Sequence, residues 1–163
     1  MKDGLIMSDS LSMEFIKGKI REEILLSSNM KLELFDENGV LKILREVHNT
    51  VTLAGKYGTM DLLLAIPTFA KPNWMAVGNG IPSGTLLGGE IARVVLDSKT
   101  RNNNVVTFIC TFPAGTGTGT LIEAGLFDIA TANTINMWLS GTFASIPKTG
   151  ADSLVITWTL TQN

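Results

Sequence analysis

Two glycine-rich segments could do chemistry, because glycine-rich loops that open an apolar element often bind phosphate. The first is "GTGTGT" at 115–120, which runs into the apolar segment "LIEAGLFD". A phosphate-binding loop also needs a lysine after its last glycine and then a helix, but no lysine follows any glycine of 115–119 and the next segment is strand-like. In the second, "GNGIPSG" at 78–84, the third glycine comes one residue too late for a dinucleotide fingerprint. Both segments are therefore predicted to be connections, and no cofactor is expected.

Few side chains could catalyse a reaction. His48 is the single histidine, and no Gly-x-Ser-x-Gly elbow supplies a serine nucleophile. Because His48 and Asn49 lie between a strand and a helix, we expect them to cap or hydrogen-bond that junction. Glu90 and Glu123 lie on or beside strands and could form the carboxylate pair of a glycosidase, but nothing in the sequence brings them together. The sequence therefore predicts a protein that is not an enzyme, with the glycosidase as the least favoured alternative.

The composition excludes several classes of protein. One histidine, one cysteine and scattered acidic residues give no metal-binding spacing. The net charge of −2 and the charged fraction of 17% exclude the basic footprint of a nucleic-acid-binding protein. No apolar run reaches the roughly 18 residues of a membrane span. Cys110, in the alternating run "VVTFICTF", is expected to be a small buried hydrophobe.

The elements that would position any site fall into two parts. Residues 10–27 have the apolar spacing of an amphipathic helix, and 1–29 are predicted to form a helical arm ahead of a domain at 30–163. Its candidate anchor residues are Met13, Phe15, Ile16, Ile20 and Ile24. The helix either packs on its own domain or docks on a neighbouring subunit.

The domain itself is predicted to be mainly β. Asn38-Gly39 between alternating runs predicts a hairpin, a short helix is expected near 52–65, and strands with turns follow from 73. Residues 91–98 and 105–112 are expected to pair across the polar loop "KTRNNN", and the last strand carries Trp158 on its core face. This pattern predicts an antiparallel β-sandwich of jelly-roll-like form.

Two further residues and one pair are candidate site residues. Trp138 falls on the strand face opposite Met137 and Leu139, so it is expected to be exposed, at an interface or on a sugar-binding surface. Trp74 is the second candidate for the same role. Glu123, costly to bury alone, is expected to pair with Arg93, which also lies mid-strand in apolar company.

The order of several motifs from about 30 to 161 resembles a known class of protein. The motifs are "HNTVTLAG", "MAVGNG", "TLLGGEIAR", "LIEAGLFD" and "GTFASIPKTGADSLVITWTL". Together they resemble the small virion structural proteins of tailed bacteriophages. The resemblance implies a non-enzymatic protein that self-associates, a trimer being one option, and attaches to other virion proteins. It would decorate the capsid or form part of a tail, collar or fibre, in a virion assembled in the host cytoplasm.

One alternative of a different class stays open. The same sandwich could be a carbohydrate- or receptor-binding module on a virion appendage, with a host-surface glycan as its partner and Trp138 or Trp74 as its stacking platform. Neither nucleic acid nor a membrane is expected as a partner.

Overall fold

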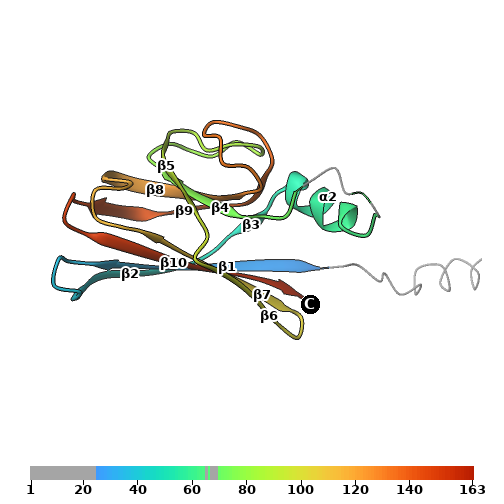
Figure 1. Ribbon diagram of the computed structural model, residues 1–163, viewed down its shortest axis with the longest axis horizontal. Helices are drawn as coiled ribbons and strands as arrows, with labels where there is room; N and C mark the ends of the chain where they lie inside the picture. Colours follow the sequence, from blue (N-terminus) through green and yellow to red (C-terminus); the bar gives the residue numbers. More distant parts are fainter. Residues whose placement is uncertain (1–24, 65, 67–69) are drawn as a thin grey trace, which may run out of the picture.

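A computed structural model describes residues 25–64, 66 and 70–163, and it is an antiparallel β-sandwich with one short helix (Figure 1). The first sheet has the order β2 (Leu41–His48), β1 (Leu26–Phe35), β10 (Ser153–Gln162), β7 (Val105–Phe112) and β6 (Ser98–Asn102). The second sheet has the order β3 (Thr50–Val51), β9 (Met137–Lys148), β8 (Gly119–Phe127), β4 (Trp74–Gly78) and β5 (Glu90–Val95). The helix α2 (Leu53–Asp61) lies at one end of the two layers. The predicted fold class is confirmed.

The sandwich begins earlier than the sequence indicates. Strand β1 starts at Leu26, which pairs with Gln162 of β10, so residues 26–29 belong to the first sheet and not to a helical arm. The anchor residues Met13, Phe15, Ile16, Ile20 and Ile24 lie outside the described residues.

The core lies between the two sheets, where the strands alternate inward apolar and outward polar side chains. Trp158 of β10 is fully buried there, as predicted, and its indole Nε1 donates to Ser28 Oγ at 2.7 Å. Apolar residues of both sheets complete the core, among them Leu32, Phe112, Leu126 and Ile156. Cys110 is also fully buried in this layer, as the sequence indicated.

Burial of Cys110 predicts an inert thiol. Desolvation, and to a lesser extent the negative charge of Asp97, raise the pKa of the Cys110 thiol to about 12. Because the thiolate is the reactive form, we expect no labelling of the native protein by a maleimide at pH 8 and full labelling in urea. Mass spectrometry of timed aliquots measures this. Labelling of the native protein at the rate of the unfolded chain would contradict the buried position.

The sequence predicted one hairpin correctly and one wrongly. β1 and β2 pair around Asn38-Gly39, where Gly39 has a φ of +77° and Asp36 Oδ1 accepts from the Asn38 and Val40 amides. The expected pairing of 91–98 with 105–112 is wrong. β5 pairs with β4 in the second sheet, and the polar loop supplies β6, which pairs with β7 in the first sheet.

The start of α2 differs from the expected junction. The predicted helix near 52–65 is present, but its cap is Thr52, whose side chain accepts from the Gly55 amide at 3.0 Å. His48 is instead the exposed last residue of β2, and Asn49 hydrogen-bonds through its backbone amide to the Ser28 carbonyl at 2.9 Å. The capping role expected for these two residues is therefore wrong. Along the described ranges, α2 falls short of the length and apolar character needed to cross a membrane.

Candidate functional site

Glu123 is fully buried on β8 and is held by backbone amides rather than by a cation. Its Oε1 accepts from the Gly80 amide at 2.9 Å and the Gly89 amide at 2.7 Å, and its Oε2 accepts from the Gly88 amide at 2.9 Å. A Cβ on Gly78 would lie 2.4 Å from Glu123 Oε1, so the carboxylate fits only against glycine there. The "GNG", "LGGE" and "EAG" parts of the sequence thus meet in one buried anion site.

Arg93 pairs with Glu90, not with Glu123, so the expected Glu123–Arg93 pair is wrong. Arg93 Nε and Nη2 donate to the two carboxylate oxygens of Glu90, each at 2.8 Å, and both side chains are 2% exposed. The register shift in β5 explains this partner. Ile91 is an extra residue opposite the Val77–Gly78 step, which places Glu90 and Arg93 on the same face of the sheet.

The two carboxylates fasten loops over the outer face of the second sheet. Glu123 holds the loop at 79–89 by accepting from the backbone amides of that loop. Arg93 Nη1 donates to the Ile129 carbonyl at 2.9 Å, and the Arg93 guanidinium lies 3.7 Å above the Phe127 ring. Figure 1 shows both connections, before β5 and before β9, lying above that sheet. Because a general acid must reach its substrate, this burial and bonding give Glu90 and Glu123 a structural role.

In the described ranges, His, Cys, Asp and Glu form no group that could hold a metal.

Trp138 is in the core, so its expected exposure is wrong. It is 4% exposed, and a register shift between β8 and β9 makes it an extra residue opposite the Leu126–Phe127 step. The bulge turns Trp138 inward with Leu139, whereas Met137 faces outward beneath the loops. Trp74 is half-buried and packs on the same outer cluster as Met137. Trp138 therefore offers no platform for stacking a sugar.

A second buried polar group, which the sequence did not indicate, lies at the turn between β9 and β10. Lys148 is 2% exposed and its Nζ donates to the carbonyls of Pro113 and Asp152 at 3.0 and 2.7 Å. Asp152 accepts from Lys42 at 2.9 Å and from the amide and hydroxyl of Thr149, each at 2.7 Å. Burial lowers the pKa of Lys148, while the Lys42 bond, followed by the Thr149 bonds, lowers the pKa of Asp152 to about 2.

The Asp152 bonds predict a loss of stability in acid. The folded pKa lies below the ordinary value near 4, so the stabilisation is complete above about pH 4 and is lost as the pH falls toward 2. Urea unfolding between pH 2 and 6 should show a steeper loss for the wild type than for Asp152→Asn. Glu37→Gln, which alters an exposed hairpin carboxylate, is the matched control and should follow the wild type. Parallel curves for wild type and Asp152→Asn would contradict this role.

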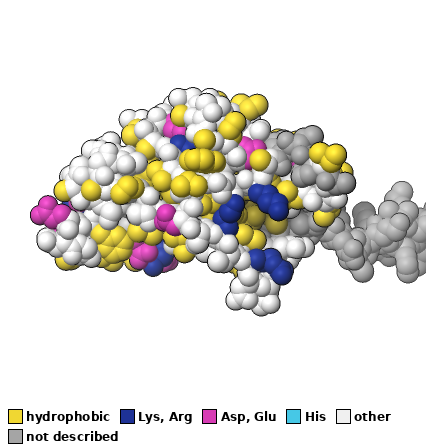
Figure 2. Space-filling view, in the orientation of Figure 1, with side chains coloured by type: hydrophobic (Ala, Val, Ile, Leu, Met, Phe, Trp, Pro, Cys, Tyr) yellow, Lys and Arg dark blue, Asp and Glu magenta, His cyan; other side chains and the backbone are white. Residues whose placement is uncertain are grey.

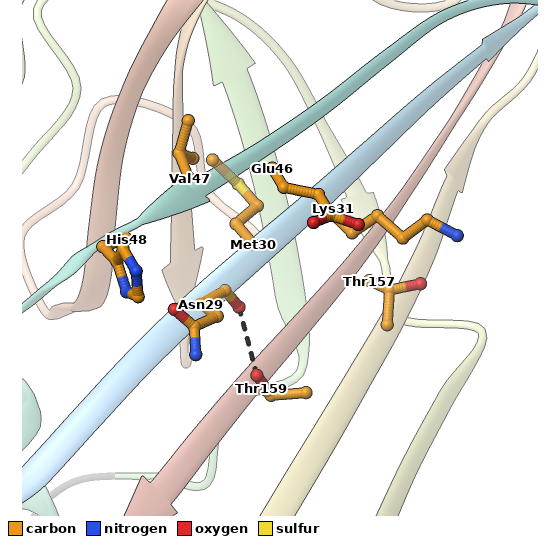
Figure 3. Close-up of a pocket in the computed structure, with 8 residues that line it drawn as sticks. All are labelled: Asn29, Met30, Lys31, Glu46, Val47, His48, Thr157 and Thr159. Atoms are coloured by element: carbon orange, nitrogen blue, oxygen red, sulfur yellow. Dashed lines mark hydrogen bonds between the residues drawn. The ribbon is translucent and has the colours of Figure 1, made fainter.

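A concavity of about 590 Å³ lies over β1, β2 and β10 (Figure 3). Residues of both charges and several hydroxyl or amide groups line it, including Asn29, Lys31, Glu46, His48, Thr157 and Thr159. The close-up shows the Thr159 hydroxyl directed at the Asn29 carbonyl, a distance of 3.4 Å. This open surface can accept hydrogen bonds from a polar partner, but among the described residues no Trp, Tyr or Phe side chain lines it.

The most unusual surface is apolar and lies on and just after α2. We call it the α2 surface; its members are Leu53, Tyr57, Met60, Leu62, Leu63, Leu64 and Ile66. Exposure is 64% for Leu53, 78% for Leu63 and 87% for Ile66. Single exposed apolar side chains are ordinary, but a group gathered on one short segment is typical of an interaction surface.

A second cavity, of about 520 Å³, adjoins the C-terminal part of α2, and we call it the end cavity. It lies between the sheets, with apolar walls and Lys71, Lys99 and Arg101 among its lining residues. Figure 2 shows Lys and Arg side chains gathered beside hydrophobic ones on this face, on a surface that is otherwise mostly uncharged.

The segments that carry the resemblance to virion proteins have defined places in the sandwich. "HNTVTLAG" connects β2 to α2, the three motifs "MAVGNG", "TLLGGEIAR" and "LIEAGLFD" meet at Glu123, and "KTGADS" forms the Lys148–Asp152 turn. No family model matches the chain, and neither curated proteins nor solved structures give a match.

Proposed function

We propose that this chain is a non-enzymatic structural component of a tailed-phage virion, which self-associates and attaches to other virion proteins. The observation that carries the proposal is the α2 surface, where apolar side chains such as Leu63 and Ile66 stand 78% and 87% exposed. Burial of apolar area stabilises an interface by roughly 25 cal/mol per Å². The stabilisation that such a surface gives is largest when the same contact is repeated through a symmetric assembly.

The interior supports a mechanical role. Glu90, Arg93 and Glu123 are used to fix loops, and Lys148 and Asp152 are used to fix a turn. The charged groups that the sandwich buries therefore hold its shape. A rigid body with an apolar docking surface suits capsid decoration, or a part in a tail, collar or fibre, and a trimer is one form that its self-association would take.

The N-terminal segment is the second candidate for attachment. We expect a chain lacking residues 1–24 to fold, because β1 begins only at Leu26, but to be lost from particles. Deletion of 1–9, which keeps Met13, Phe15, Ile16, Ile20 and Ile24, is the control and should leave incorporation unchanged. Complementation of a phage lacking the gene, followed by blotting of purified particles, measures incorporation. Normal incorporation of the longer deletion would show that this segment is not the anchor.

A second function is supported by the concavity of Figure 3. Its amide, hydroxyl and charged groups, such as Asn29, Thr157 and Lys31, could bind a glycan or a receptor on the host surface. A glycan array with the wild type, Asn29→Ala and Trp74→Ala separates the two candidate positions. Binding lost only in Asn29→Ala would place the site in the concavity, and loss only in Trp74→Ala would place it at that tryptophan. An array without binding would remove this function.

A further inference from the structure

The end cavity combines features that a purely structural crevice does not need. Its walls include Val106, Phe108, Leu126, Trp138, Leu139 and Leu160, contributed by both sheets. Its volume of about 520 Å³ lies inside the roughly 300–1,000 Å³ of small-molecule sites. An apolar ligand would therefore find both space and an apolar wall at this end of the sandwich.

Positive charge gathers on one side of this apolar space. Lys71, Lys99 and Arg101 all line the cavity and are exposed, and none of its described lining residues is acidic. Lys99 Nζ donates to the Pro72 carbonyl at 3.1 Å and to Asn73 Oδ1 at 2.9 Å, and Arg101 Nη1 donates to the Asn103 carbonyl at 3.2 Å. Those partners are neutral, so Lys99 and Arg101 are not neutralised by the groups that orient them.

A buried donor on the apolar wall also lacks a partner. Trp138 is 4% exposed, and its Nε1 has no hydrogen-bond acceptor within the described part of the chain. An unpaired buried N–H costs on the order of the full desolvation of that group. A ligand in the cavity would lie against this indole, so the Trp138 N–H resonance can report that the cavity is occupied.

We propose that the end cavity binds a single-chain amphiphile with an anionic head group, the chain lying along the apolar wall and the anion beside Lys71, Lys99 and Arg101. The cavity is too small to be a membrane-binding surface, and its positive charge disfavours a cationic or neutral head group. The anion could be a carboxylate, as in a fatty acid, or a phosphate, as in a fragment of a phospholipid. This site does not depend on the proposed virion role, and binding measurements alone test it.

The test is calorimetric titration of the full chain with four ligands that share one alkyl chain: decanoate, decyl phosphate, 1-decanol and decyltrimethylammonium. We expect the two anions to bind roughly tenfold or more tightly than the alcohol, because charge-assisted hydrogen bonds are the stronger ones, and the cation not to bind. Tighter binding of decanoate would identify a fatty acid as the source of the ligand, and tighter binding of decyl phosphate a phosphorylated lipid fragment.

Two matched variants assign the site. Lys71→Gln/Arg101→Gln should weaken decanoate roughly fivefold or more and leave 1-decanol unchanged. Arg45→Gln/Lys56→Gln removes as many charges away from the cavity and should change neither. In the wild type, decanoate should also shift the Trp138 indole N–H resonance. Three results would each overturn the proposal: equal affinity for decanoate and decanol, no binding of any ligand, or an unmoved Trp138 resonance. If no ligand binds, the polypeptide itself fills the cavity.

Discussion

Glu123→Ala is expected to lower the free energy of unfolding by about 4 kcal/mol, the largest effect of any single carboxylate in the sandwich. The substitution removes the acceptor that the part-buried hydrogen bonds of the Gly80, Gly88 and Gly89 amides share. Glu123→Gln keeps an oxygen for two of the amides but places its NH₂ group against the Gly88 amide, so we expect roughly half the loss. Urea unfolding at pH 7 measures both variants.

The control for this prediction is Glu46→Ala, which removes an exposed carboxylate from β2 and should stay within about 0.5 kcal/mol of the wild type. Hydrogen exchange gives a local readout, because the Gly80, Gly88 and Gly89 amides should lose their protection in Glu123→Ala. A cost below about 1 kcal/mol, with those amides still protected, would show that the loop at 79–89 is held by other contacts.

Gly55→Ala is expected to destabilise the fold by about 3 kcal/mol, although alanine is the better helix former. A Cβ on Gly55 would lie 2.1 Å from the Trp138 carbonyl oxygen, and this atom belongs to the backbone and cannot turn away. That carbonyl also accepts from the Thr52 amide at 3.1 Å, so the clash acts on the same bonds that begin α2. The helix has to lift from β9 to make room.

Gly84→Ala is the matched control, because a Cβ there meets nothing within 4 Å, and it should change stability by less than about 0.5 kcal/mol. Thermal unfolding followed by Trp fluorescence reports the helix contact directly, since Trp138 packs against it. Equal stability of Gly55→Ala and Gly84→Ala would contradict the close approach of α2 to β9.

Features set by neighbouring residues could be predicted from the sequence. The β1–β2 hairpin needs only alternation and a turn residue that tolerates positive φ, and Asn38-Gly39 supplies it. The burial of Cys110 and Trp158 follows from the same alternation within one strand. These predictions are confirmed because side chains of a regular strand change faces at every residue.

Features set by distant strands could not be predicted in this way. Single extra residues at Ile91 and Trp138 reverse the alternation, and they depend on how β5 and β9 register with their neighbours. The partners of Glu123 are backbone amides, which have no side-chain signature. The only sign of them was the glycines at 78, 80, 88 and 89. The absent side chain of Gly78 leaves room for the carboxylate, and those of the other three let the two parts of the loop approach each other.

Quantitative mass spectrometry of purified phage particles tests whether this chain is, as we propose, a structural component of a virion. We expect the chain to be present in many copies per particle, in a fixed ratio to the other structural proteins across independent preparations. The ratio should survive washing with high salt, because the α2 surface is apolar and apolar contacts are not screened. A chain abundant in infected cells but absent from the particles would contradict a structural role in the virion.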